Sequence, residues 1–164
     1  MVLTCLDSRT APETMFDQGI GDLFVGRIAG NFAADYMIGS FEFAHKLAGA
    51  RVLAVVGHSS CGAVKGACDG AKLGNLTHTL AQLSPALDAV AASVQPRNAK
   101  NPDFVQKVAD ANVRLTVDRV LAKSEVLRDM VKSGDLGVIG GMYDFSTGKV
   151  TFYADTAHGL KMPK

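Results

Sequence analysis

Residues that can bind a metal or hold a proton stand close together at the start of the chain. The first thirteen residues, MVLTCLDSRTAPE, place Cys5, Asp7 and Arg9 at alternate positions. In an extended segment such residues share one face, so a thiolate, a carboxylate and a guanidinium would point into the same space. The simpler interpretation is a surface ion pair between Asp7 and Arg9, which contributes little stability.

A second pair of candidate ligands, His58 and Cys61, stands in the motif GHSSCGA. Alone, this spacing is a weak indication of a metal, because a capped helix start with a buried thiol looks the same. Together with Cys5 it makes a candidate Cys₂His site, and three protein ligands with one open position are typical of catalytic zinc. Thiolate and imidazole ligands also favour zinc over magnesium or calcium. We therefore predict Zn²⁺ as the cofactor.

Asp7 has two possible partners in such a site. Its carboxylate can take the fourth position on the zinc, as a further ligand in a closed state. Alternatively, a bidentate pairing with Arg9 can hold it away from the metal, because the guanidinium fork matches a carboxylate. The sequence does not decide between these two states at neutral pH.

The elements that must position these residues follow from hydrophobic periodicity. Short apolar runs alternate with longer stretches in which apolar residues recur at helical spacing. The runs predict strands over residues 2–5, 22–29, 51–57, 135–145 and 149–154. The longer stretches predict helices over residues 35–48, 76–94 and 103–131, with an exposed loop over residues 95–102.

This order predicts an α/β fold with a mostly parallel β-sheet and helices on both faces. Functional residues of such sheets sit at the carboxyl ends of the strands. Cys5 ends the first predicted strand, and His58 follows the third. If these strands are neighbours, the predicted ligands meet at one edge of the sheet.

Bulk properties exclude several function classes. A length of 164 residues suits one domain over residues 1–164, and 17 Lys and Arg against 16 Asp and Glu leave no basic field for nucleic acid or an anionic membrane. We find no apolar run of the roughly 20 residues that a membrane span needs. The three cysteines are an odd number, which argues against a disulfide framework. Small-molecule chemistry is the remaining expectation.

The other histidines and the third cysteine receive structural interpretations. Cys68 lies two helical turns after Cys61 and is expected to be a buried core thiol. His45, His78 and His158 are expected to be surface residues or histidines with satisfied hydrogen bonds.

Taken together, the motifs resemble the β class of carbonic anhydrases. CLDSR and HSSCG match the family's two ligand motifs, and DLFVGRIAGN, GSFEFA, VLAVVGH and GGMYDFSTGKV extend the match over nearly the whole chain. The resemblance implies zinc on Cys5, His58 and Cys61, and a gating dyad of Asp7 and Arg9. It also places Gln18 and Arg27 in segments that line or support the pocket.

The implied reaction is the reversible hydration of carbon dioxide to bicarbonate and a proton by zinc-bound hydroxide. A hydrolase of carbon disulfide or carbonyl sulfide on the same scaffold stays open as an alternative, as does a non-catalytic zinc-binding module. The family also carries an N-terminal helical arm before the first cysteine. That arm is absent from this sequence, so we expect the chain to be incomplete at this end.

The resemblance further implies a homo-oligomer, either a homodimer or a dimer of dimers. Apolar residues spread around the predicted helix over residues 35–48, namely Met37, Ile38, Phe41 and Phe43, agree with burial against a partner as well as the sheet. A cytoplasmic location is the default expectation, with a periplasmic one left open.

Overall fold

The computed structural model describes residues 1–161 and contains a central, mostly parallel sheet. Its strand order is β2-β1-β3-β4-β5, in which the first four strands are mutually parallel and β5 is antiparallel to β4. The strands are β1 (Val2–Thr4), β2 (Val25–Arg27), β3 (Val52–His58), β4 (Gly137–Asp144) and β5 (Lys149–His158). The predicted fold class is confirmed.

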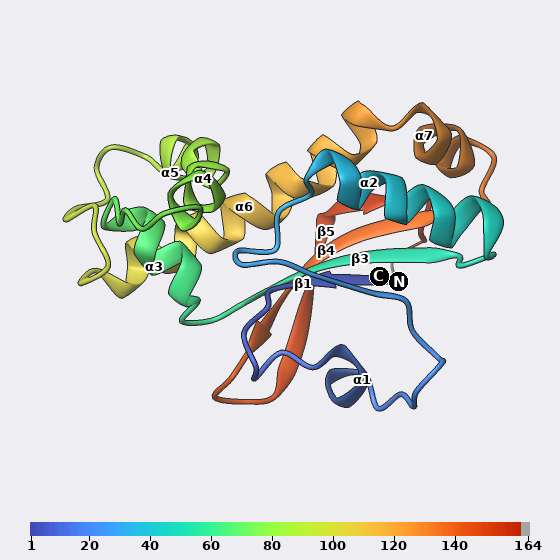
Figure 1. Cartoon of the computed structure of the whole chain (residues 1–164), viewed down its shortest axis with the longest axis horizontal. Helices are drawn as coiled ribbons and strands as arrows, with labels where there is room; N and C mark the ends of the chain where they lie inside the picture. Colours follow the sequence, from blue (N-terminus) through green and yellow to red (C-terminus); the bar gives the residue numbers. More distant parts are fainter. Residues whose placement is uncertain (162–164) are drawn as a thin grey trace.

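Helices cover the two faces of the sheet unequally. The longer helices α2, α6 and α7 lie on one face, whereas the short α1 is the one helix of residues 1–161 that lies on the other (Figure 1). The helices are α1 (Pro12–Met15), α2 (Asp35–Glu42) with the π-helical turn η1 (Phe43–Leu47), α3 (Gly62–Cys68), α4 (Leu76–Ala81), α5 (Ser84–Ala89), α6 (Pro102–Lys123) and α7 (Glu125–Lys132). Within residues 1–161, no helix has both the length and the apolar character needed to cross a membrane.

The strand β3 is buried on both faces, as its continuous apolar run predicts. Leu53 and Val55 belong to the large core beneath the long helices, whereas Ala54 and Val56 belong to a smaller apolar cluster on the opposite face. This two-sided burial fixes the position of the strand that ends at His58.

Helix α6 packs against the centre of the sheet where two glycines leave room for it. A Cβ atom at Gly57 or Gly140 would lie 2.8 or 2.7 Å from the side chain of Val113 on α6. The start of α6 is fixed as well, since the side chain of Asn101 accepts hydrogen bonds from the backbone N–H groups of Asp103 and Phe104.

Two predicted helices are each divided in the structure. The prediction of one helix over residues 103–131 is wrong, because Ser124 leaves the helical conformation (φ −107°, ψ 109°) and its Oγ caps α7 through the N–H of Leu127. The prediction of one helix over residues 76–94 is also wrong. Pro85 has no N–H to continue the hydrogen-bond ladder, so α5 begins anew after α4.

Candidate metal centre and adjoining ion pair

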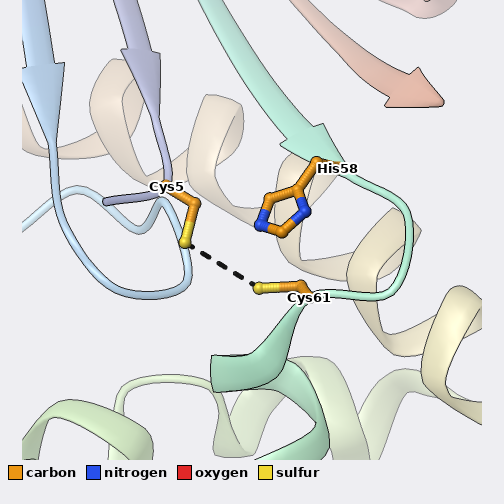
Figure 2. A group of neighbouring side chains, drawn as sticks. All are labelled: Cys5, His58 and Cys61. Atoms are coloured by element: carbon orange, nitrogen blue, oxygen red, sulfur yellow. Dashed lines mark hydrogen bonds between the residues drawn. The ribbon is translucent and has the colours of Figure 1, made fainter. Parts of the chain in front are cut away.

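Three side chains converge where β1 and β3 end. Cys5 follows β1, His58 is the last residue of β3, and Cys61 caps the start of α3 (Figure 2). Their ligand atoms all lie within 4.8 Å of one another, and the two sulfur atoms are 3.9 Å apart. All three residues are buried. The group, drawn from segments more than 50 residues apart, could therefore hold a metal ion.

Sheet register explains why distant residues meet here. Thr4 pairs with Val56 in the parallel ladder, so Cys5 leaves β1 beside the end of β3. Ser60 then adopts a left-handed conformation (φ 55°), which is uncommon for a residue other than glycine. This tight turn brings Cys61 back toward Cys5 directly after His58.

The histidine is held in one orientation and one tautomer. His58 Nδ1 lies 3.0 Å from the carbonyl oxygen of Ser59. Because a carbonyl can only accept a hydrogen bond, Nδ1 carries the proton and Nε2 keeps its lone pair. Nε2 is buried and has no hydrogen-bond partner among the described residues. An unpaired buried nitrogen is costly, so this atom is suited to binding a ligand that the side chains do not supply.

The two thiols at the centre have opposite tendencies to ionise. The hydrogen bond with Cys61 is the main cause that lowers the pKa of the Cys5 thiol, against the opposing effect of burial. The His58 ring and the backbone N–H of Gly30, 3.4 Å from Cys5 Sγ, lower it further. The same thiol pairing and burial raise the pKa of Cys61. The pairing of the two thiols thus favours the thiolate form of Cys5 and the protonated form of Cys61.

Asp7 and Arg9 form a bidentate ion pair next to this group. Arg9 Nε and Nη2 donate to the two carboxylate oxygens of Asp7 at 2.9 and 2.8 Å. The backbone N–H of Arg9 adds a third bond to Asp7 Oδ1 at 3.0 Å. Both carboxylate oxygens accept from Arg9, which is the arrangement that holds Asp7 away from a metal.

The local backbone differs from the predicted extended segment. The N–H of Thr10 donates to the carbonyl of Asp7 at 2.9 Å, which closes a turn over residues 7–10. The prediction that residues 5, 7 and 9 share a face of an extended segment is therefore wrong. Short side chains such as that of Asp7 bond readily to nearby backbone N–H groups and favour turns over strands.

The carboxylate of Asp7 is strongly stabilised in its ionised form. The side-chain hydrogen bonds from Arg9 are the largest cause, and they hold the pKa of Asp7 well below its usual range although burial opposes them. A group with so low a pKa accepts hydrogen bonds at neutral pH and does not store a proton.

Two further side chains fix the loop that joins Cys5 to Arg9. Arg27 donates from Nε to the carbonyl of Cys5 at 3.0 Å and from Nη2 to the carbonyl of Asp7 at 2.5 Å. The buried hydroxyl of Thr10 contacts the same two carbonyls at 2.9 and 2.8 Å. Gln18 instead donates to the carbonyls of Phe16 and Asp17 in its own loop. The resemblance singled out Gln18 and Arg27. The structure brings Arg27 to the site, whereas the hydrogen bonds of Gln18 stay within its own loop.

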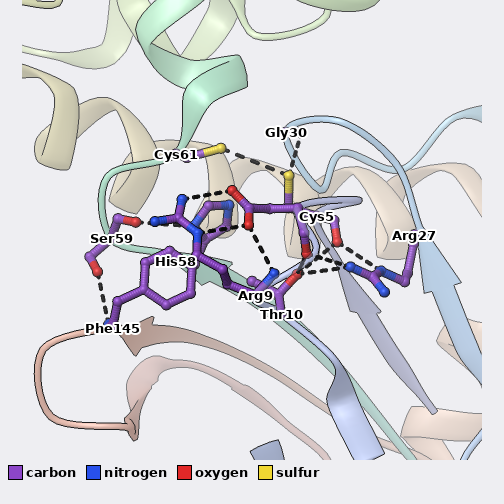
Figure 3. Close-up of polar contacts among 10 residues, drawn as sticks. Cys5, Arg9, Thr10, Arg27, Gly30, His58, Ser59, Cys61 and Phe145 are labelled. Carbon is purple, nitrogen blue, oxygen red and sulfur yellow. Dashed lines mark hydrogen bonds and ion pairs between the residues drawn. The ribbon is translucent and has the colours of Figure 1, made fainter.

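Sequence reasoning missed Phe145 and Ser59, which lie against the site (Figure 3). The Phe145 ring is 4.9 Å from the His58 ring, and the guanidinium carbon of Arg9 is 4.1 Å from its centroid. The motif GGMYDFSTGKV contains Phe145, but only the pairing of His58 with Tyr143 across β3 and β4 reveals the proximity.

The remaining histidines and Cys68 lie outside this group. Cys68 is a buried core thiol, as predicted. His45 is buried, with Nδ1 2.8 Å from the carbonyl of Ala50, while its Nε2 has no partner among the described residues. The expectation of a surface or fully satisfied histidine is therefore wrong for His45. His78 is exposed, and His158 is half-buried.

Comparisons with known proteins show the family of the chain. The family described as carbonic anhydrase matches residues 1–150. Carbonic anhydrase 2 of Mycobacterium tuberculosis is 32% identical over 149 residues, which are 91% of this chain and 71% of that protein.

Two solved structures show the same class. The β-carbonic anhydrase of Coccomyxa in complex with acetazolamide is similar at 27% identity and a TM-score of 0.82, over 92% of this chain and 69% of that one. One of two tetrameric β-carbonic anhydrases of Sordaria macrospora is similar at 26% identity and a TM-score of 0.77, over 93% and 79%. The chain thus belongs to the carbonic anhydrase family and to its β class, and the predicted carbonate dehydratase is confirmed with that membership.

Proposed function

We propose that this chain hydrates carbon dioxide reversibly to bicarbonate and a proton, as one zinc-dependent catalytic domain over residues 1–164. We assign Cys5 Sγ, His58 Nε2 and Cys61 Sγ as the zinc ligands, and Asp7 and Arg9 as the catalytic dyad. The observation that carries the proposal is the buried trio with an unpartnered His58 Nε2, directly beside a bidentate carboxylate–guanidinium pair.

The residues present fit zinc. Two thiolates on a tetrahedral zinc, each at about 2.3 Å, stand about 3.8 Å apart, and the two sulfur atoms here are 3.9 Å apart. The free lone pair of His58 Nε2 supplies the third donor, and its Nδ1–H bond to Ser59 is the outer contact that metal-binding histidines usually make. Bound there, zinc would lower the pKa of a water molecule and supply the nucleophile near neutral pH.

The side chains of this chain determine how that chemistry is used. The ionised Asp7, held by Arg9, offers its carboxylate as a hydrogen-bond acceptor and would leave a zinc ion on the three ligands accessible to water. Arg27 and Thr10 hold the carbonyls of Cys5 and Asp7, so the ligand and the acceptor keep a fixed separation. The product proton then passes to solvent.

The ligand charges set the direction of the pH dependence. Two thiolates offset the 2+ charge of zinc, whereas three neutral histidines would leave it in place. Zinc held by these residues would therefore lower the pKa of a bound water less, and we expect activity to rise toward alkaline pH.

We further propose a homo-oligomer, either a homodimer or a dimer of dimers. Helix α2 and η1 bury Ile38 and Phe41 against the rest of the chain, but they expose Tyr36, Phe43 and Leu47 by 73, 57 and 76%. Large apolar side chains gathered on one exposed helix face support a subunit interface there. The Sordaria relative is described as tetrameric.

The test combines metal analysis with substrate profiling on the purified protein. We expect one zinc per chain and stopped-flow hydration of carbon dioxide that increases with pH. Carbonyl sulfide and carbon disulfide are assayed in parallel, and a strong preference for either would replace the proposed substrate. A zinc-loaded protein inactive on all three would be a zinc-binding module. Sedimentation velocity tests the assembly, and a stable active monomer would contradict it.

A further inference from the structure

The β4–β5 hairpin places one aromatic ring against both parts of the site. We propose that Phe145 is a positioning residue, whose ring keeps the guanidinium of Arg9 in place on Asp7. This inference rests on the proposed function, because it assigns Phe145 a role in maintaining the catalytic dyad.

The contact with Arg9 has the geometry of a cation–π interaction. The guanidinium carbon lies 4.1 Å from the centroid of the Phe145 ring, well within the roughly 6 Å that such an interaction allows. The Arg9 side chain is 55% exposed, and its Nε and Nη2 donate to Asp7 while its guanidinium carbon lies over the ring. The ring and the carboxylate therefore hold the guanidinium from two directions.

The same ring also contacts His58, the last residue of β3, and Tyr143 of β4. Its centroid lies 4.9 Å from the His58 ring at 51°, and 5.5 Å from the Tyr143 ring in an edge-to-face arrangement. The backbone N–H of Phe145 donates to Ser59 Oγ at 3.0 Å, and the carbonyl of Ser59 contacts His58 Nδ1 (Figure 3). Phe145 is thus tied to the residue that orients His58.

The hairpin turn that presents Phe145 is held by its own hydrogen bonds. The carboxylate of Asp144 accepts from the N–H and hydroxyl of Ser146 and from the hydroxyl of Thr147. Gly148 then adopts a left-handed conformation (φ 68°), which returns the chain into β5. A turn fixed in this way can hold a ring at a set position.

The consequence of this arrangement is specific. A long exposed arginine loses rotamer freedom when it is held in one geometry. Among residues 1–161, the Arg9 guanidinium contacts the Phe145 ring and the carboxylate of Asp7, so without the ring the carboxylate is the one remaining contact that holds it. An exposed cation–π contact shifts the equilibrium between the held and the free Arg9 side chain about two- to fivefold. We therefore expect Phe145 to affect turnover through Arg9, without affecting zinc binding.

The test uses the zinc-loaded full chain and two single substitutions. Phe145→Leu keeps an apolar side chain but removes the aromatic ring, whereas Phe145→Tyr keeps the aromatic ring. Phe152→Leu is the matched control, since Phe152 belongs to the same hairpin but stacks on Phe16. The measurements are zinc content, kcat and KM for carbon dioxide, and the ¹⁵N NMR signal and water exchange of Arg9 Nε–H near pH 6.

We expect Phe145→Leu to retain one zinc per chain and to lower kcat about two- to fivefold with KM within twofold. The Arg9 Nε–H signal should lose its ring-current shift and exchange faster with water. Phe145→Tyr and Phe152→Leu should match the parent in kcat and in exchange rate. An unchanged Arg9 signal in Phe145→Leu, or failure of Phe145→Tyr to restore the parent values, would overturn the inference. An inactive parent protein would instead refute the proposed function, and the NMR signal would still decide the contact.

Discussion

Two arginine–aspartate pairs lie against aromatic rings of the same hairpin, and the comparison shows what separates a structural pair from a candidate catalytic one. Arg9 pairs with Asp7 over Phe145, and Arg114 pairs with Asp155 over Tyr153. In both, the guanidinium carbon lies 4.1 Å from the ring centroid and the nearest N–O contact is 2.8 Å. The local chemistry is therefore nearly the same.

The surroundings of the two pairs differ. Tyr153 donates its hydroxyl to Asp110 at 2.6 Å, and Gln106 donates to the same oxygen at 2.9 Å. The Asp155 side chain is 61% exposed, whereas that of Asp7 is only 20% exposed. Beside Asp7 lie two buried thiols and the unpartnered Nε2 of His58. An ion pair on a ring is a stabilising contact in both places, and the three convergent ligand atoms beside the Asp7 pair make its surroundings a candidate metal site.

The largest expected effect comes from removing one of those ligand atoms. Cys5→Ser should lose its zinc, because hydroxyl oxygen is a poor substitute for thiolate. Its activity should fall by more than the roughly 100-fold that is lost when a residue supporting a metal ligand is removed. Elemental analysis and stopped-flow hydration measure both quantities. Cys68→Ser is the matched control, since Cys68 is a buried thiol in the core. A Cys5→Ser protein with full zinc and full activity would refute the assigned ligand set.

The second effect separates the two arginines directly. Arg9→Ala should keep one zinc per chain but lose roughly 10- to 100-fold in kcat, because the freed Asp7 carboxylate can take the fourth position on the metal. Arg114→Ala removes an equivalent pair whose partners, Asp155 and Tyr153, are not among the proposed ligands, and it should leave kcat within twofold. Equal losses of activity in both variants would mean that the Asp7 pair is only a structural contact.

The sequence predicted the sheet because its pattern is local. The continuous apolar run that becomes β3 needs burial on both faces, and short strands followed by long amphipathic stretches require parallel crossovers. The divided helices were missed because periodicity continues across the break at Ser124. The break depends on a tertiary contact, since Ser124 Oγ donates to Glu42 at 2.6 Å while it caps α7.

The convergence of Cys5, His58 and Cys61 was predictable because strand ends in a parallel sheet meet at one edge. Phe145 was not, since its ring reaches Arg9 across 136 positions of sequence and depends on the register of β4 against β3. The state of Asp7 was also undecided from the sequence. The turn over residues 7–10, which brings the N–H and the guanidinium of Arg9 to one carboxylate, became apparent only in three dimensions.

A smaller effect is expected at the second pair, on stability alone. Tyr153→Phe removes the hydroxyl that donates to Asp110 at 2.6 Å. Loss of one such hydrogen bond should lower the free energy of unfolding by about 1 kcal/mol, while the ring beneath Arg114 stays. Urea denaturation measures the change, and kcat should be unaffected. A Tyr153→Phe variant with altered kcat and unaltered stability would mean that the Arg114–Asp155 pair affects catalysis and is not a purely structural contact.

The smallest effect is the pH-dependent stabilisation of the fold by the pair of Arg114 and Asp155. The hydrogen bond from Arg114 is the main cause that lowers the pKa of Asp155 below its ordinary value. A carboxylate with a lowered folded-state pKa stabilises the fold at pH values above its unfolded pKa of about 4. That contribution is lost as the pH falls through the folded-state pKa, where the group becomes neutral. Asp155→Asn is neutral at every pH, so its melting temperature should lie about 1 to 2 °C below that of the parent at pH 7. The two melting temperatures should converge as the pH is lowered below about 4, and thermal melts across that range test this. A gap that widens in acid would contradict the assigned sign.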